Sequence, residues 1–136
     1  MSEIILPAIT IKTAILAREK GFAEKTSKYM VAYSEGDYAY GICNKEENFN
    51  EKGGSSYGDK IYSVPTQALL QEWLREKHKI HIAVNGLYRK NVMVAYTYDI
   101  CQQGKNPYTE GIHSVQTFPT YKEAMEDALQ AALRKL

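Results

Sequence analysis

Three histidines are the residues of this chain best suited to acid–base chemistry or metal binding. His78 and His81 form an H-x-x-H pattern, and His113 is the third. Imidazole is a common general base and a common zinc ligand. However, His78 is predicted to end a helix and His81 to lie on the next strand, so their side chains need not point together. We therefore assign no catalytic or metal-binding residue, and a small enzyme with a histidine acid/base stays open as an alternative.

The chain lacks the motifs of the common enzyme classes. It has no G-x-S-x-G, no Walker A loop and no G-x-G-x-x-G. The run GGSS at 53–56 is not followed by a Lys-Ser/Thr pair opening a helix, so it makes a poor phosphate cradle. We expect a non-catalytic protein without a cofactor.

Charge and length restrict the class of protein. The 136 residues carry 17 basic and 16 acidic side chains, a net charge of +1. This balance argues against a protein built mainly to neutralise phosphates. No apolar run approaches the roughly 20 residues of a membrane helix, and the apolar run at 4–6 lacks a basic flank, so we expect a cytoplasmic protein. The two cysteines, Cys43 and Cys101, do not make a disulfide framework.

Basic side chains gather near one predicted corner. They flank the junction of a helix and a strand and a predicted turn at Asn85-Gly86, and they are Arg75, Lys77, Lys79, Arg89 and Lys90. If they meet in space, they form a patch that could bind phosphates. A weak nucleic-acid-binding module is therefore a second alternative, beside the simpler interpretation of a solvated rim.

The first half of the chain predicts a helix, a hairpin and a loop. Residues 10–20 have a helical apolar stripe, with Thr10 placed to cap the start and Gly21 placed for the left-handed C′ position. Strands are expected at 28–33 and 38–43, joined by a turn at SEGD. Two polar segments, 44–59 and 102–111, are expected to be mobile loops.

The second half predicts the order helix, strand, strand, strand, helix. The elements are expected at 63–78 with Pro65 in the first turn and Trp73 in the core, at 80–84, at 92–100, at 113–118, and at 120–136 with a T-x-x-E capping box from Thr120 to Glu123. This order resembles that of the double-stranded-RNA-binding domain. In that family the last helix starts with basic residues that grip phosphates, whereas Lys122 is the only base at that place here.

Tyrosine is unusually common, with eleven residues. Tyr38 and Tyr40 alternate along one predicted strand, and Tyr96 and Tyr98 along another. Aromatic residues favour strands, so we expect a sheet with tyrosines on a half-exposed face, and a binding surface is the alternative. The tetrapeptide MVAY also occurs twice, at 30–33 and 93–96, which we interpret as chance similarity because other short echoes have different offsets, and a duplicated helix–hairpin unit is the alternative.

Three segments resemble a family. They are YSVPTQALLQEWLREKHKIHI at 62–82, TYKEAMEDALQAAL at 120–133 and AILAREKGF at 14–22. They resemble small uncharacterised proteins of phages and mobile elements in gut bacteria of the Bacteroides group. These motifs are caps and core positions, so no functional residue is carried over. The resemblance implies a cytoplasmic accessory protein encoded by a phage or mobile element.

These observations predict a single α+β domain spanning 1–136. We expect a mainly antiparallel sheet with helices packed on one face. The function expected first is a non-catalytic binding or regulatory module with a protein partner. Nucleic acid and a second copy of the chain remain alternative partners, and no membrane is expected.

Overall fold

The computed structural model describes residues 7–33, 35–51 and 59–136. Within these ranges the chain folds as two compact units, Met1–Thr66 and Gln67–Leu136. Each unit contains a three-stranded antiparallel sheet and at least one helix, so the predicted α+β class is confirmed. The strands form two sheets, whereas a single sheet was predicted. That residues 1–136 form a single domain stays a prediction.

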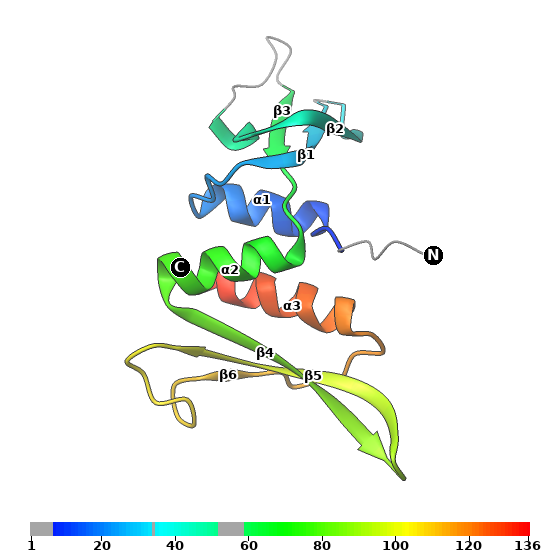
Figure 1. Ribbon diagram of the computed structural model, residues 1–136, viewed down its shortest axis with the longest axis vertical. Coiled ribbons are helices and arrows are strands. Elements are labelled where there is room, and N and C mark those ends of the chain that lie inside the picture. The colour runs from blue at the N-terminus through cyan, green and yellow to red at the C-terminus, as the bar shows by residue number, and fades with distance from the viewer. Residues whose placement is uncertain (1–6, 34, 52–58) are drawn as a thin grey trace. The chain divides into compact units, whose positions relative to one another are not determined.

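The first unit packs one helix against a sheet with the strand order β2-β1-β3 (Figure 1). Its elements are α1 (Ile11–Glu19), β1 (Thr26–Ala32), β2 (Tyr38–Glu47), the short 3-10 helix η1 (Phe49–Glu51) and β3 (Lys60–Ser63). The predicted end of α1 is confirmed. Gly21 has φ +91°, and the Phe22 N–H donates to the Ala17 carbonyl oxygen at 2.9 Å, which closes the helix as a Schellman motif.

The predicted loop at 44–59 begins later than expected. Residues 44–47 continue β2, and Phe49 in η1 is buried. The Phe49 and Ser63 backbones are held by side chains, because the Phe49 N–H donates to Ser63 Oγ at 3.0 Å and the Ser63 N–H donates to Asn50 Oδ1 at 2.9 Å. The rest of the predicted loop, residues 52–58, lies outside the described residues.

The second unit packs two helices on one face of a sheet with the strand order β4-β5-β6 (Figure 1). Its elements are α2 (Gln67–His78), β4 (Ile80–Arg89), β5 (Val92–Gln102), β6 (Ile112–His113) and α3 (Tyr121–Arg134). The predicted order of helix, three strands and helix is confirmed. The last strand is much shorter than predicted, and Phe118 joins β5 only through an isolated bridge to Tyr96.

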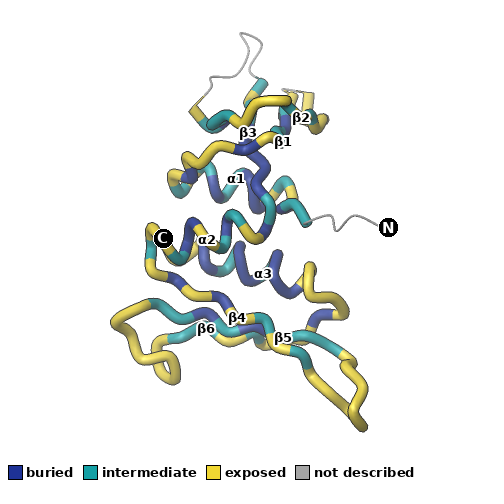
Figure 2. Tube along the Cα trace, in the orientation of Figure 1, coloured by how far each residue is buried: buried dark blue, intermediate teal, exposed yellow. Residues whose placement is uncertain are grey.

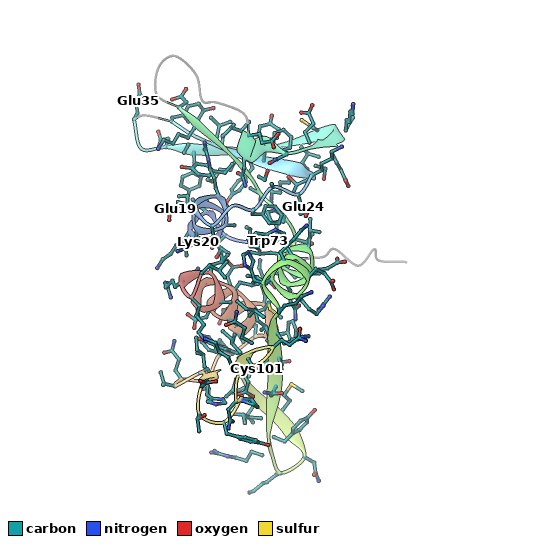
Figure 3. The ribbon with its side chains drawn as sticks, turned by 90° about the vertical axis from the view of Figure 1, so that its left-hand side faces the viewer. Glu19, Lys20, Glu24, Glu35, Trp73 and Cys101 are labelled. Carbon is teal, nitrogen blue, oxygen red and sulfur yellow. The ribbon has the colours of Figure 1, made fainter. Side chains whose placement is uncertain are left out.

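Helix α2 starts four residues later than predicted. Ser63 ends β3, and the next two residues are engaged elsewhere, because the Val64 N–H donates to the Lys28 carbonyl and the Pro65 carbonyl accepts from the Ile9 N–H. Because residues 63–65 are held in these extended contacts, the helix begins after them, at Gln67. Trp73 is buried on α2 as predicted (Figure 3).

Helix α3 forms as the sequence predicts. The Glu123 N–H donates to Thr120 Oγ1 at 3.1 Å, which is the expected N-cap bond. Small side chains bring the helix close to the strands, and the fully buried ones include Ala124, Ala128 and Ala132. The opposite face of the sheet carries the polar residues of β4 and β5.

Candidate functional site

The predicted turn at Asn85-Gly86 is wrong, and this error changes the candidate site. Strand β4 runs through both residues, and Gly86 pairs with Tyr96. The hairpin turns instead at Lys90 and Asn91, which have φ values of +50° and +65°. Two central residues with positive φ are typical of a type I′ turn, whose twist matches that of the flanking strands.

The five basic residues therefore do not form one patch. Lys79 precedes β4, and Arg89 ends this ten-residue strand. At about 3.3 Å per residue, the two ends lie roughly 30 Å apart. Arg75 and Lys77 are on α2 near Lys79, whereas Arg89 and Lys90 are together at the hairpin turn. The predicted corner is split into two groups, and a role for either group in binding stays a prediction.

The far part of the β4–β5 hairpin, residues 86–95, is a two-stranded arm (Figure 1). Strand β6 pairs with β5 only at Asp99 and Ile100, so it does not reach the arm. The arm is exposed from Leu87 to Val94, and only its base at Gly86 and Ala95 is partly covered (Figure 2). Its large apolar side chains have high relative exposures: Leu87 39%, Tyr88 66%, Val92 62%, Met93 41% and Val94 54%.

One face of the arm continues the face of the sheet that packs on the helices. The Met93 side chain lies over Gly86, since a Cβ added at Gly86 would come within 2.7 Å of Met93 Cε. Met93 pairs with Tyr88 across the strands. Gly86 pairs with Tyr96, whose ring makes an edge contact with Tyr121 at the start of α3, with centroids 6.1 Å apart. The helix layer ends at the contact between Tyr96 and Tyr121, and the apolar face of the sheet continues beyond it along the arm.

The arm is positively charged. Residues 86–95 read GLYRKNVMVA and contain two basic side chains and no acidic one. Neither the Arg89 nor the Lys90 side chain has a hydrogen bond or an ion pair with any residue that the structure describes. The tip of the arm therefore presents two uncompensated charges beside an uncovered apolar face.

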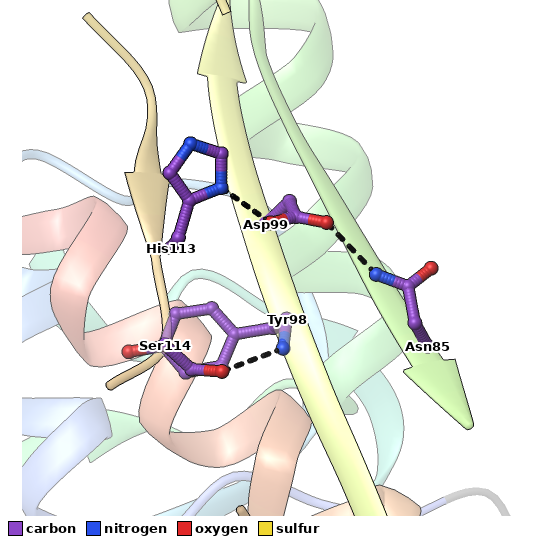
Figure 4. A network of polar contacts seen from close by, with 5 residues as sticks. All are labelled: Asn85, Tyr98, Asp99, His113 and Ser114. Carbon is purple, nitrogen blue, oxygen red and sulfur yellow. Dashed lines mark hydrogen bonds and ion pairs between the residues drawn. The ribbon is translucent and has the colours of Figure 1, made fainter. Parts of the chain in front are cut away.

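A second group of polar residues lies on the open face of the β4-β5-β6 sheet (Figure 4). His113 Nδ1 is 2.5 Å from Asp99 Oδ1, and the Asn85 side-chain amide donates to Asp99 Oδ2 at 2.9 Å. Asp99 thus receives one contact from each neighbouring strand. Both His113 and Asp99 are about half exposed. Because His113 uses Nδ1 for this contact, its Nε2 is left for proton exchange with a bound group.

The three histidines do not converge. His78 ends α2, where its ring lies edge-on to Trp73 with centroids 4.7 Å apart. His81 is exposed on β4 opposite Cys101 of β5, which is labelled in Figure 3. His113 is on β6, which is separated from β4 by β5, so the two strands lie roughly 10 Å apart. Among the described residues, no three His, Cys, Asp or Glu side chains are grouped as a metal site.

Sequence reasoning missed the arm and the Asp99 cluster. The alternating pattern correctly places Val92 and Val94 on a strand, β5, but their exposure depends on where the helices end. Asp99 alternates with the buried Tyr98 and Ile100, which was a signal that it faces outward. Its partner on β6 could not be identified, because the register between β5 and β6 was not predictable.

The tyrosines divide between two environments. Tyr38 and Tyr40 are exposed on β2, as expected for a half-exposed face. Tyr98 is buried, and its hydroxyl donates to Asp127 Oδ2 at 2.7 Å. Burial, followed by this hydrogen bond and the charge of Asp127, raises the pKa of Tyr98 to about 12. Tyr98 therefore belongs to the core of the second unit and not to a binding surface.

Comparison with known proteins assigns no family to this chain. No family model, no curated protein and no solved structure matches it. No helix in the described part of the chain has the length and hydrophobicity needed to span a membrane.

Proposed function

We propose that this protein is a non-catalytic binding or regulatory protein that holds a protein partner on the arm. The observation that carries the proposal is the exposed face formed by Tyr88 and Met93, on a ribbon whose other face exposes Leu87 and Val92. A contiguous exposed apolar surface marks an interaction site more often than a scattered one does. Aromatic residues, methionine and arginine are also the types enriched in protein interfaces, and Tyr88, Met93 and Arg89 supply all three.

A nucleic-acid module is supported less well. Arg89 and Lys90 at the tip of a β-ribbon could contact phosphates, since the major groove admits such a ribbon. The five basic residues on which this alternative was based are divided between the two ends of β4. An arm whose two faces expose mainly apolar side chains, such as Leu87 on one and Tyr88 on the other, is also unusual for contact with a phosphate backbone.

One observation favours a small enzyme as a second candidate. Asp99 orients the His113 ring through Nδ1, as a carboxylate orients a general base. The pair lies on an open sheet face at about half exposure. Replacing His113 with Gln should abolish any hydrolytic activity found in a substrate screen, and a screen without activity would remove this candidate.

We place the protein in the cytoplasm as an accessory protein of a phage or mobile element. This context is supported by the resemblance of the segments at 14–22, 62–82 and 120–133 to such proteins. A second copy of the chain remains an alternative partner. Light scattering that gives only monomer at high concentration would remove it.

Site-directed photo-crosslinking in the cells that natively contain the protein tests the proposed function. A benzophenone amino acid replaces Tyr88 on the arm in one variant and Tyr108 in the other. Tyr108 is a matched control because it is a tyrosine of the same unit, is 90% exposed and lies outside the arm. We expect discrete protein adducts from position 88 that are absent from position 108.

A further change separates specific capture from collision. Met93→Asp, placed in the same chain as the crosslinker at position 88, should remove the adducts because it puts a charge in the apolar face. No adduct at position 88, or the same adducts at both positions, would overturn the proposed function.

A further inference from the structure

We propose that the partner segment is an acidic amphipathic helix that lies on the arm beside α3. This inference rests on the proposed function and names the chemistry of the partner. It follows from the direction of the exposed side chains, from the end of the helix layer at Tyr121 and from the charge of the arm.

Tyr88 and Met93 stand on one face of the ribbon, because they pair across the strands and Met93 lies over Gly86, whereas Leu87 and Val92 project to the other face. Side chains project from a sheet alternately to its two faces, and a layer packed on a face lies about 10 Å away. A strand added to the edge, at about 4.8 Å, would pair the backbone but leave Tyr88 and Met93 uncovered. Covering these two residues therefore requires a layer stacked on the arm, which favours a helix over an added strand.

The second unit shows how a helix fits this face. Helix α3 packs on β4 and β5, and its buried side chains include Ala128 and Leu129. The layer ends where Tyr121 meets Tyr96. Beyond that contact, the same face carries Met93 over Gly86 and then Tyr88. A partner helix placed there would extend an existing helix layer along the sheet.

Charge selects the polar face of the partner helix. Lys90 lies in the turn at the end of the Tyr88–Met93 face, Arg89 pairs with Val92 on the other face of the ribbon, and residues 86–95 contain no acid to compensate them. Complementary charges at the edge of an interface favour the correct partner, and like charges there are unfavourable. A helix with Asp or Glu next to its apolar stripe fits this surface. Two copies of the arm placed face to face would bring together like charges, which disfavours a second copy as the occupant.

The test uses designed helical peptides as probes for the full-length protein. Two labelled peptides of about 18 residues, long enough to form helix in water, share one Leu stripe at i, i+3, i+4 and i+7. The remaining positions are Glu-rich in one peptide and Lys-rich in the other. Duplex DNA and anionic lipid vesicles are measured beside them, and binding is followed by fluorescence anisotropy or by co-sedimentation with the vesicles.

Three variants locate the contact. Tyr88→Ser with Met93→Ser removes the apolar face, Arg89→Glu with Lys90→Glu reverses the charge, and Tyr108→Ser is the matched control. We expect the Glu-rich helix to bind about ten-fold more tightly than the Lys-rich helix, the effect of one or two close charge pairs. The charge-reversed variant should invert this preference. The variant with Tyr88→Ser and Met93→Ser should lose binding of both peptides. The Tyr108→Ser control should bind them as the original protein does.

Other outcomes overturn the inference. Equal binding of the two helices, tighter binding of the Lys-rich helix, or no binding of either would contradict an acidic helical partner. Tight binding of duplex DNA or vesicles that survives the loss of Tyr88 and Met93 would assign the tip to phosphates instead. If position 88 still crosslinks to protein in cells, only the acidic helix is rejected and the proposed function stands. If position 88 does not crosslink to protein, both the acidic helix and the proposed function are rejected.

Discussion

The tetrapeptide MVAY occurs in both units and has a different fate in each. Met30 in β1 is fully buried, whereas Met93 in β5 is 41% exposed. Strand β1 lies between β2 and β3, so Met30 has a paired strand on each side. Met93 lies on the arm, where only β4 pairs with β5. The methionine of the tetrapeptide is therefore core in the unit where its strand is paired on both sides and surface where it is paired on one side, whereas Tyr33 is exposed and Tyr96 only partly so.

The uncovered residues of the first unit differ from those of the arm. On β2, Tyr38, Tyr40 and Ile42 are exposed, but the two tyrosine rings contact the same unit. The Lys28 ammonium lies 4.6 Å from the centre of the Tyr40 ring, and the rings of Tyr38 and Tyr40 meet edge to face at 6.2 Å. Tyr88 has no such ring contact with a described residue. Unlike Tyr38 and Tyr40, Tyr88 is therefore left without a ring contact in its own unit.

The largest expected effect is on the core of the second unit. Trp73→Ala should lower the free energy of unfolding by about 3–5 kcal/mol, because it removes a large buried side chain and leaves a cavity. Tyr88→Ala, an aromatic truncation on the arm, should change it by less than about 0.5 kcal/mol. Urea unfolding of both variants measures the difference. A similar loss in the two would mean that the arm is part of the core.

The two methionines of MVAY provide the next comparison. Met30→Ala should cost about 2–5 kcal/mol, the range for a buried methionine. Met93→Ala should cost much less, about 0.5 kcal/mol, because Met93 is 41% exposed and lies on the uncovered arm. Thermal denaturation of the two variants is the measurement. Equal costs would contradict the assignment of burial to the neighbouring strands.

Two glycines allow the same comparison at the backbone. A Cβ at Gly41 would come within 2.3 Å of the Tyr29 ring, which packs on Phe49 with centroids 4.9 Å apart. Gly41→Ala should therefore cost about 1–3 kcal/mol, as overpacking does. A Cβ at Gly86 would meet only the flexible end of Met93. Gly86→Ala should be close to neutral in urea unfolding, and a larger loss than for Gly41→Ala would show that Met93 is held in place.

A further expected effect is a pH dependence in the core face of β5. The pKa of Tyr98 is raised from 10.0 to about 12 in the folded protein. The folded state therefore favours the protonated phenol, and this contribution to stability is complete below pH 10 and is lost as pH rises through 12. Tyr98→Phe lacks this titration, so the stability advantage of the original protein should shrink between pH 10 and 12. Melting temperatures that differ by a constant amount across this range would contradict the assignment.

Much of the secondary structure was predictable because its signals are local. The left-handed Gly21, the N-cap at Thr120 and the alternation of Tyr98 with Ile100 each depend on residues a few positions apart. The start of α2 was misplaced, because the backbone at 63–65 bonds to segments far away in the sequence. Such long-range bonds leave no local pattern in the sequence.

The candidate site was predictable only as a set of residue types. The basic residues were identified correctly, but the turn at Asn85-Gly86 that would have gathered them does not exist. In β4, Gly86 provides room for Met93, and Lys90 and Asn91 take the positive φ values of the turn. A local turn signal was thus overridden by the pairing of two long strands.

By itself, the sequence determined the α+β class, the order of the elements and the residues that start and end helices, because periodicity and capping act over a few residues. Only the tertiary structure decided that the strands form two sheets, that β6 contributes two residues, and that the helix layer stops at Tyr121. These features depend on which distant segments pair and on where packed layers end. The arm, and with it the proposed binding surface, exists because one hairpin extends beyond the helices that cover the rest of its sheet.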